Sequence, residues 1–285
     1  MTTEQDLSTH PIRIVEVGPR DGLQSITRMV PTGVKIAFVD ALSRCGFDEI
    51  EVSSFVSPAW VPQLADATEV FAGIQRVPGV TYSALVPNEA GLERARKAGV
   101  GKIAVFTAAS ETFSRKNTNA SIAETLVRFE PVVQASGVPV RAYISTAFHC
   151  PYEGAIHPDR VVALAHSLAE LGCDELSIGD TTGRANPEEV RGLFEALLSS
   201  DLSVQLAAHF HDTFGQAVDN ARAAAALGIT TFDASAGGIG GCPYAPGAPG
   251  NVATEALVAA FAGQTGVDRE KLGKAIEVVW DARRA

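Results

Sequence analysis

The feature that most constrains this chain is the regular alternation of short strand-like runs and longer amphipathic segments along nearly its whole length. Eight runs have the length and composition of strands and cover residues 12–17, 49–53, 81–86, 102–107, 140–145, 175–178, 203–209 and 230–234. Amphipathic segments, expected to be helices, follow them near residues 33–45, 64–75, 88–98, 120–136, 158–171, 187–199, 214–226 and 251–263. Strands that alternate with helices form parallel βαβ units. The pattern therefore predicts a (β/α)8 TIM barrel, an α/β fold.

The competing architecture is an open, doubly wound sheet. Such sheets usually have fewer strands and a glycine-rich phosphate-binding turn after the first strand. The corresponding turn here, at residues 17–20, reads Val-Gly-Pro-Arg and lacks that pattern. Residues 268–285 are expected to form an additional C-terminal helix outside the barrel, and no linker or low-complexity stretch divides the chain. We therefore expect a single TIM-barrel domain over residues 1–285.

Composition narrows the class of protein. Hydrophobic residues make up 46% of the 285 residues, which is enough for a sizeable core. The formal net charge of −10 argues against a nucleic-acid binder, which needs a basic face to neutralise phosphates. No stretch approaches the roughly 18 consecutive apolar residues of a membrane span, and the N-terminus has no signal-peptide or transit-peptide pattern. Four cysteines without a CxxC pair suit a reducing compartment, so we expect a cytoplasmic protein with neither a membrane nor a nucleic acid as partner.

Two histidines mark the end of the seventh predicted strand. His209 and His211 are two residues apart, so their side chains point the same way from a strand. Barrel active sites are built at the carboxyl ends of the strands, where Asp21 follows the first strand and Asn251 begins the last barrel helix. Two imidazoles, a carboxylate and an amide oxygen predict a site for Mg²⁺, Mn²⁺ or another divalent cation, rather than a thiolate-rich structural zinc site.

Four further residues belong to the same predicted barrel mouth: Arg20, Glu51, Asp180 and Cys242. Plainer interpretations exist, because an Arg-Asp pair is often a surface salt bridge and Asp-Thr-Thr is often a helix N-cap. Glu51 is harder to dismiss, since carboxylates are depleted in strands and seldom buried unpaired. Cys242 lies in a glycine-rich loop that suits a lid. Their coincidence at one end of the barrel favours Lewis-acid catalysis on an oxygenated substrate, with Arg20 stabilising a developing enolate oxygen.

The sequence also resembles a known family, and the resemblance runs in order from about residue 12 to residue 258. It is carried by the motifs Val15-Glu-Val-Gly-Pro-Arg-Asp-Gly-Leu-Gln24, Ser53-Ser-Phe-Val-Ser-Pro58, Ala108-Ala-Ser110, Cys150-Pro-Tyr-Glu-Gly154, His209-Phe-His-Asp-Thr213 and Gly240-Gly-Cys-Pro-Tyr244. These motifs look like those of the 3-hydroxy-3-methylglutaryl-CoA lyases, metal-dependent barrel lyases named for an Asp-Arg-Glu trio. The resemblance implies a carbon–carbon lyase that cleaves 3-hydroxy-3-methylglutaryl-CoA to acetyl-CoA and acetoacetate with a divalent cation.

The resemblance also implies roles for individual residues. The positions that match the family's metal ligands are Asp21, His209, His211 and Asn251. Arg20 matches the catalytic arginine and Glu51 the glutamate of the trio. Cys242 matches the cysteine of the glycine-rich loop, and Asp180 matches an acid implicated in activity.

Three other functions stay open from sequence. A related lyase would act on citramalyl-CoA or on a longer branched 3-hydroxyglutaryl-CoA. A condensing enzyme would run the chemistry in the opposite direction, although such chains usually carry further regulatory sequence. A barrel that binds a metal or CoA without turnover is disfavoured by the intact set of Arg20, Asp21, Glu51 and Cys242. We expect an acyl-CoA substrate as partner and a homo-oligomer, for which a dimer is the commonest form.

Overall fold

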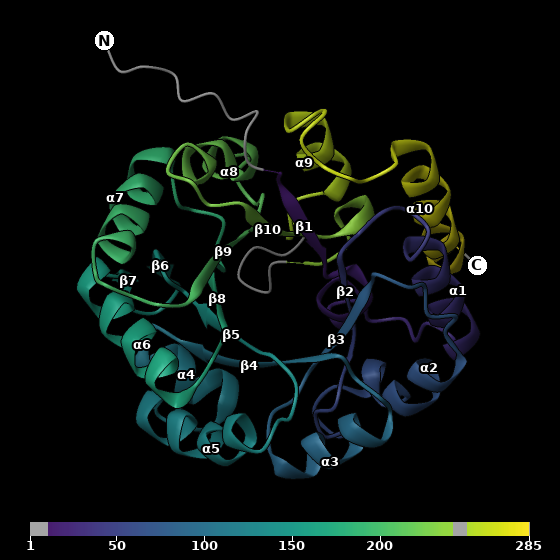
Figure 1. Ribbon diagram of the computed structural model, residues 1–285, viewed down its shortest axis with the longest axis horizontal. Coiled ribbons are helices and arrows are strands. Elements are labelled where there is room, and N and C mark those ends of the chain that lie inside the picture. Colours follow the sequence, from purple (N-terminus) through teal and green to yellow (C-terminus); the bar gives the residue numbers. More distant parts are fainter. Residues whose placement is uncertain (1–10, 242–249, 285) are drawn as a thin grey trace.

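The computed structural model describes residues 11–241 and 250–284 and forms a closed barrel of parallel strands surrounded by helices (Figure 1). The hydrogen-bonded order is β1-β10-β9-β8-β5-β4-β3-β2, and β2 pairs with β1 to close the barrel. The strands are β1 (Arg13–Glu16), β2 (Glu49–Ser54), β3 (Thr81–Leu85), β4 (Lys102–Ala108), β5 (Val140–Ser145), β8 (Glu175–Asp180), β9 (Gln205–Phe210) and β10 (Thr231–Ala234). The predicted (β/α)8 fold is confirmed.

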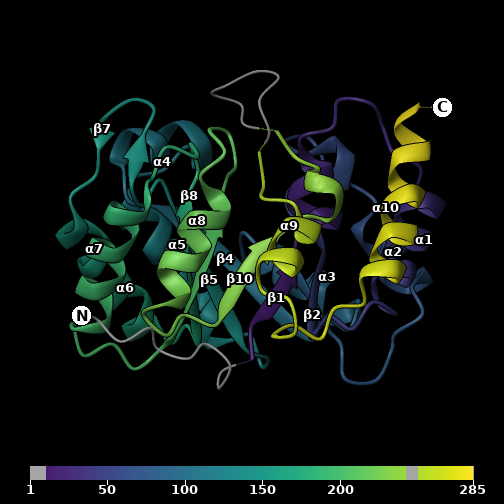
Figure 2. The same ribbon diagram turned by 90° about the horizontal axis from the view of Figure 1, so that it is seen from above.

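Helices form the outer wall of the barrel, and the side view shows them running beside the strands (Figure 2). They are α1 (Thr32–Leu42), α2 (Ala67–Gly73), α3 (Glu89–Lys97), α4 (Glu111–Thr118), α5 (Ile122–Gln134), α6 (Pro158–Leu171), α7 (Pro187–Leu198), α8 (Ala217–Ala225) and α9 (Thr254–Ala260). The predicted C-terminal helix is present as α10 (Arg269–Arg284), which packs against α1. Among the described residues, no helix is long and apolar enough to cross a membrane.

Helix α7 shows how local sequence fixes these elements. Asn186 is the N-cap, and its side chain accepts hydrogen bonds from the backbone N–H groups of Glu188 and Glu189. The Glu189 side chain bonds back to the Asn186 backbone, which completes a capping box. Pro187 occupies the first helical position, where its missing N–H costs nothing. The apolar side of the helix then packs onto the barrel with Val190, Leu193, Phe194 and Leu197 buried.

Most strand residues are buried whichever face they are on, which explains why the strand sequences lack a simple polar–apolar alternation. Every residue of β2 and of β8 is buried. In β2, Ile50 and Val52 belong to the main hydrophobic core, while Glu49 and Glu51 are equally buried and form ion pairs. Since side chains alternate along a strand, one face of β2 packs against helices and the other fills the barrel.

A π-helical turn at Gly18–Gly22 follows β1 and was not predicted. The backbone N–H groups of Arg20, Asp21 and Gly22 all point at the carbonyl of Val17, with N···O distances of 3.1, 2.7 and 3.3 Å. The turn requires glycine at its end, because a Cβ at Gly22 would lie 2.6 Å from the Ile239 side chain. The wound turn holds the side chains of Arg20 and Asp21 over the mouth of the barrel.

Helix α4 and a small hairpin also differ from the prediction. Helix α4 precedes α5 and begins after Ser110, whose side chain caps it by accepting from the Phe113 N–H. Its sequence, ETFSRKNT, has too few apolar residues to show a helical stripe, so periodicity could not detect it. The two-residue strands β6 (His149–Cys150) and β7 (Gly154–Ala155) form a small hairpin after β5, and strands this short carry no pattern.

Candidate functional site

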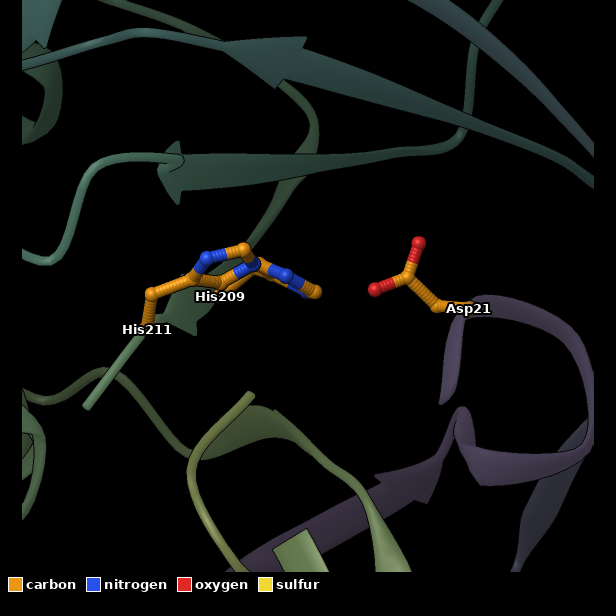
Figure 3. A group of neighbouring side chains, drawn as sticks. All are labelled: Asp21, His209 and His211. Carbon is orange, nitrogen blue, oxygen red and sulfur yellow. The ribbon is translucent and has the colours of Figure 1, made fainter. Parts of the chain in front are cut away.

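Three predicted metal ligands meet at the mouth of the barrel. Asp21 lies in the π-helical turn after β1, His209 lies near the end of β9, and His211 follows it. One ligand atom of each residue lies within 4.8 Å of those of the other two. Figure 3 shows both imidazole rings directed toward the Asp21 carboxylate. The arrangement can hold one small cation between an oxygen and two nitrogens.

Asn251, the fourth predicted ligand, lies beside this group. It forms an isolated backbone bridge with His211, and its side-chain Nδ2 donates to Asp21 Oδ2 at 2.8 Å. The Asn251 Oδ1 and His211 Nδ1 atoms are both buried and, within the described part of the chain, have no hydrogen-bond partner. Buried polar atoms normally have a partner. Two such atoms beside a carboxylate fit a divalent cation that takes nitrogen and oxygen ligands.

The electrostatics of Asp21 and His211 match that use. Burial alone would raise the pKa of Asp21, but the charges of Arg20 and the two histidines outweigh it and lower the pKa to about 2. Burial, together with the neighbouring His209, lowers the pKa of His211 to about 4. At neutral pH Asp21 is therefore a carboxylate and His211 a neutral imidazole, the forms in which these residues bind metals.

His209 has a partner that sequence analysis missed. Its Nδ1 lies 3.1 Å from Oδ2 of Asp233, a buried carboxylate on the neighbouring strand β10. Burial opposes the charged form of His209, but the hydrogen bond and charge of Asp233 prevail and raise the pKa of His209. Arg141 and His209 hold the pKa of Asp233 at about 2 against the effect of its burial. The sequence did offer one sign of this partner, because Asp233 is a charged residue inside the predicted buried strand 230–234.

Arg20 is held by a buried glutamate and a tyrosine. Its Nε donates to Glu51 Oε2 at 2.6 Å, and its Nη1 donates to Asp21 Oδ1 at 2.5 Å. The guanidinium carbon lies 5.1 Å from the ring centroid of Tyr143, whose hydroxyl also donates to Glu51 Oε2 at 3.1 Å. Arg20 is only 6% exposed. Its guanidinium therefore has little conformational freedom beside the candidate metal site.

A cavity of about 950 Å³ opens onto these residues. Its polar lining includes Arg20, Asp21, His209 and His211, together with other polar side chains such as Asn88, Asn117 and Arg128. Apolar and aromatic side chains from the loops and strands opposite include Val56, Trp60, Leu85, Phe106 and Tyr143. A cavity lined by both charged and apolar side chains suits a ligand that carries both a polar reacting group and an apolar portion.

Asp180, another residue predicted for the site, does not join this group. Asp180 ends β8, and its carboxylate accepts hydrogen bonds from the backbone N–H groups of Arg184 and Ala185 and from the Thr182 hydroxyl. Burial raises the pKa of Asp180, and its contacts order the loop after β8. Cys242 lies outside the described residues, as do residues 243–249 of its glycine-rich loop. The catalytic roles assigned to both residues stay predictions.

Comparison with known proteins assigns the chain to a family. A family model described as HMGL-like matches residues 11–279. The chain is 48% identical over 277 residues to the cytoplasmic 3-hydroxy-3-methylglutaryl-CoA lyase of Rattus norvegicus, covering 95% of this chain and 81% of that protein. It is 51% identical over 267 residues to a 3-hydroxy-3-isohexenylglutaryl-CoA/hydroxy-methylglutaryl-CoA lyase of Pseudomonas aeruginosa, covering 92% and 89% of the two chains.

A solved structure gives the same assignment. The HMG-CoA lyase from Brucella melitensis superposes on this chain with a TM-score of 0.94 and 47% sequence identity. The match covers 97% of this chain and the whole of the other. Sequence and fold agree over almost the full length, including the strands that carry the candidate site, and the chain therefore belongs to the HMGL-like family.

Proposed function

We propose that this protein cleaves 3-hydroxy-3-methylglutaryl-CoA to acetyl-CoA and acetoacetate with the help of a divalent cation. The observation that carries the proposal is the convergence of Asp21, His209 and His211 beside an immobilised Arg20, all on one wall of the cavity. The activity is that named for the family members of similar sequence.

Asp21, His209, His211 and Asn251 are the residues that would hold the cation. When bound there, Mg²⁺ or Mn²⁺ would supply Lewis acidity toward the oxygen atoms of the substrate. The unpartnered Asn251 Oδ1 and His211 Nδ1 support this donor set. Their lone pairs would otherwise be buried without compensation.

The residues of the chain account for the remaining electrostatics of a retro-Claisen cleavage. In this reaction the tertiary hydroxyl loses its proton, the bond between C2 and C3 breaks, and its electron pair becomes the enolate of the thioester. Protonation of the enolate carbon then gives acetyl-CoA, and the carbonyl formed at C3 belongs to acetoacetate. The Arg20 guanidinium, fixed by Glu51 and Tyr143, can donate to the enolate oxygen as negative charge develops there.

Cys242 is proposed as the residue that delivers or relays a proton once its loop closes over the substrate. This assignment rests on the resemblance of residues 240–244 to the family motif. Alkylation of the thiol should inactivate the enzyme, and a substrate analogue should protect it. Peptide mapping that shows Cys242 alkylated while activity is retained would remove it from the mechanism.

A longer branched 3-hydroxyglutaryl-CoA is the second candidate substrate. The Pseudomonas aeruginosa relative is named for both an isohexenyl and a methyl substrate. In this chain Leu85, Ala104 and Tyr143 form a small apolar cluster separate from the main core, with Val56 and Phe106 packed against it. All of these except Ala104 also line the cavity. Such a wall can accept a larger apolar substituent at C3 than methyl.

A panel of acyl-CoA substrates tests both proposals. Protein stripped with EDTA should release no acetyl-CoA, and Mg²⁺ or Mn²⁺ should restore release from 3-hydroxy-3-methylglutaryl-CoA. Comparable turnover of the isohexenyl analogue would establish the broader activity, while release from citramalyl-CoA alone would favour that alternative. Full activity in excess EDTA, with elemental analysis showing no bound metal, would contradict the proposal.

The wider assignments follow from this function. We propose one lyase domain over the whole chain, with an acyl-CoA substrate as its small-molecule partner. Assembly as a homodimer and residence in the cytoplasm stay predictions, which gel filtration with light scattering and cell fractionation would test.

A further inference from the structure

The pairing of strands β9 and β10 places a second carboxylate, that of Asp233, next to the candidate metal ligand His209. Asp233 is the register partner of His209 in the parallel pairing of these strands. Both side chains point into the barrel, where Asp233 is 2% exposed. Asp233 does not line the cavity, so a substrate would meet the His209 ring but not the carboxylate behind it.

Three strands hold the Asp233 carboxylate in place. Arg141, on β5, donates from Nη2 to Oδ1 at 2.6 Å. Ser177, on β8, donates from its hydroxyl to Oδ2 at 2.7 Å. His209 Nδ1 lies 3.1 Å from the same Oδ2. The Arg141 and Ser177 side chains are fully buried, so these contacts are shielded from competing water.

This geometry fixes the tautomer of His209. An ionised carboxylate that already accepts from an arginine and a serine has only lone pairs to offer. The proton between Asp233 and His209 must therefore be on Nδ1, which leaves Nε2 of a neutral imidazole with its lone pair free for a ligand. The ring as a whole faces Asp21 (Figure 3).

We propose that Asp233 is a positioning residue for the cation and acts through His209. Arg141 and Ser177 hold the Asp233 carboxylate in the orientation that this role needs. The inference rests on the proposed function only in its assumption that a cation binds at the mouth. It also separates the two histidines: His209 has a carboxylate that orients its ring, whereas His211 Nδ1 has no hydrogen-bond partner among the described residues. Losing Asp233 should therefore affect one imidazole and spare the other.

The plainer role for Asp233 is that of a counter-ion for Arg141 within the barrel. That role predicts lower folding stability in a variant but unchanged cation affinity in the protein that folds. Glu49 offers a matched control, because it is also a barrel carboxylate, 1% exposed, and its ion-pair partners are Arg13 and Lys102. Glu49→Gln changes the same chemical group without touching His209.

The experiment measures Mn²⁺ binding to metal-stripped full-length protein by electron paramagnetic resonance. We expect Asp233→Asn to weaken Mn²⁺ binding by about 10–100-fold, the range typical of lost outer-shell carboxylates. Ser177→Ala should weaken it less, and Glu49→Gln should leave it unchanged. Equal affinity of folded Asp233→Asn and wild type would overturn the proposal, as would equal losses in Asp233→Asn and Glu49→Gln.

A second readout does not need a bound metal. The ¹⁵N spectrum of side-chain-labelled, metal-free wild type should show His209 protonated at Nδ1, and Asp233→Asn should shift it toward the Nε2 tautomer. Neutral wild-type His209 with its proton on Nε2 rather than Nδ1 would refute the proposal even if Asp233→Asn failed to fold. If wild type bound no Mn²⁺, the proposed function would fail, while the tautomer measurement would still decide the role of Asp233.

Discussion

The barrel contains two groups of buried charges that use the same kinds of side chain in different proportions. At its amino end, the first residues of four strands form what we call the basal ring: Arg13, Glu49, Lys102 and Glu175. At its carboxyl end lies the mouth cluster: Arg20, Asp21, Glu51, His209, His211 and Asn251. Both are enclosed in the same fold and largely excluded from water.

In the basal ring the charges alternate around a closed circuit. Glu49 contacts Arg13 at 2.7 Å and Lys102 at 2.9 Å, and Glu175 contacts Lys102 at 3.0 Å and Arg13 at 3.6 Å. Arg141 also pairs with Glu175, at 2.9 Å, so three cations contact the two carboxylates of the ring. Buried charges of this kind are tolerated because each is paired. The cations at this end of the barrel therefore compensate both carboxylates of the ring.

In the mouth cluster one arginine faces two carboxylates. Arg20 contacts both Asp21 and Glu51, so a single arginine serves two carboxylates. The unpartnered nitrogen of His211 and oxygen of Asn251 add lone pairs to the same place. The basal ring thus pairs its carboxylates with cations, whereas the mouth cluster also contains an imidazole nitrogen and an amide oxygen without partners among the described residues. Such a mixed set of nitrogen and oxygen donors suits a divalent cation.

The largest effect should be on the free energy of unfolding, when a cation is removed from the basal ring. Lys102→Met removes the shared cation of Glu49 and Glu175, so the free energy of unfolding should fall by about 3–5 kcal/mol. The folded protein should keep near-wild-type turnover, because Lys102 lies at the opposite end of the barrel. Denaturant unfolding and steady-state kinetics measure the two quantities. The double variant Lys102→Met/Glu49→Gln should recover part of the lost stability, and a still less stable double variant would contradict this account of the ring.

The next largest effect should come from Arg20, and here it should appear in catalysis. Arg20→Lys keeps the charge but loses the planar donor geometry that contacts Glu51 and Asp21. Turnover should fall by roughly 100–1000-fold, or about 2.7–4 kcal/mol in the activation barrier, with little change in the Michaelis constant. Thermal melting checks that the variant folds. A turnover number near that of wild type would make Arg20 a structural residue like those of the basal ring.

Another buried carboxylate, Glu16, sharpens the comparison because its hydrogen-bond partners are neutral. Its oxygens accept from the backbone N–H groups of Gly18 and Ala236 and from the Thr254 hydroxyl. Burial outweighs these bonds and raises the pKa of Glu16 from 4.5 to about 7. The folded protein therefore holds this proton more tightly than the unfolded chain does.

The sign of the pH dependence follows from that difference. The contribution of Glu16 to stability should be fully present below about pH 4.5 and should be lost as the pH rises to about 7, amounting to at most about 3 kcal/mol. Glu16→Gln should flatten this part of the stability curve. Unfolding free energies of both proteins across that range provide the measurement, and parallel curves would mean that Glu16 does not cause the slope.

The smallest expected effect on the free energy of unfolding comes from removing an exposed ion pair. Lys274 contacts Glu270 at 2.7 Å on α10, with the two side chains 69% and 81% exposed. Lys274→Ala should change the free energy of unfolding by no more than about 0.5 kcal/mol, since water and salt screen such pairs. A loss comparable to that of Lys102→Met would show that burial is not what distinguishes the basal ring.

Much of the fold was predictable because its signals are local. Each strand of the barrel is a short run of core residues between helices, and the predicted strand 140–145 coincides with β5. The polar helix α4 and the two-residue strands β6 and β7 lack such a pattern. The π-helical turn at Gly18–Gly22 depends on close packing against Ile239, which is distant in sequence.

The site residues likewise divide into those that local sequence indicates and those that depend on tertiary structure. The proximity of His209 and His211 was predictable from their spacing, and that of Asp21 and Asn251 from their places at strand and helix ends, while their role as metal ligands stays a prediction. Asp233 was not, because its importance arises from the register between β9 and β10. The backbone contacts of Asp180 likewise depend on the path of its loop, which no short motif encodes.

The central claim is that the mouth cluster binds one divalent cation through its carboxylate, imidazole and amide donors. The most direct test titrates Mn²⁺ into metal-stripped wild type, His211→Ala and Glu49→Gln, with free Mn²⁺ followed by electron paramagnetic resonance. We predict one tight site per chain in wild type and in Glu49→Gln, and loss of that site in His211→Ala. Undiminished Mn²⁺ binding by folded His211→Ala, or no tight site in wild type, would contradict the claim.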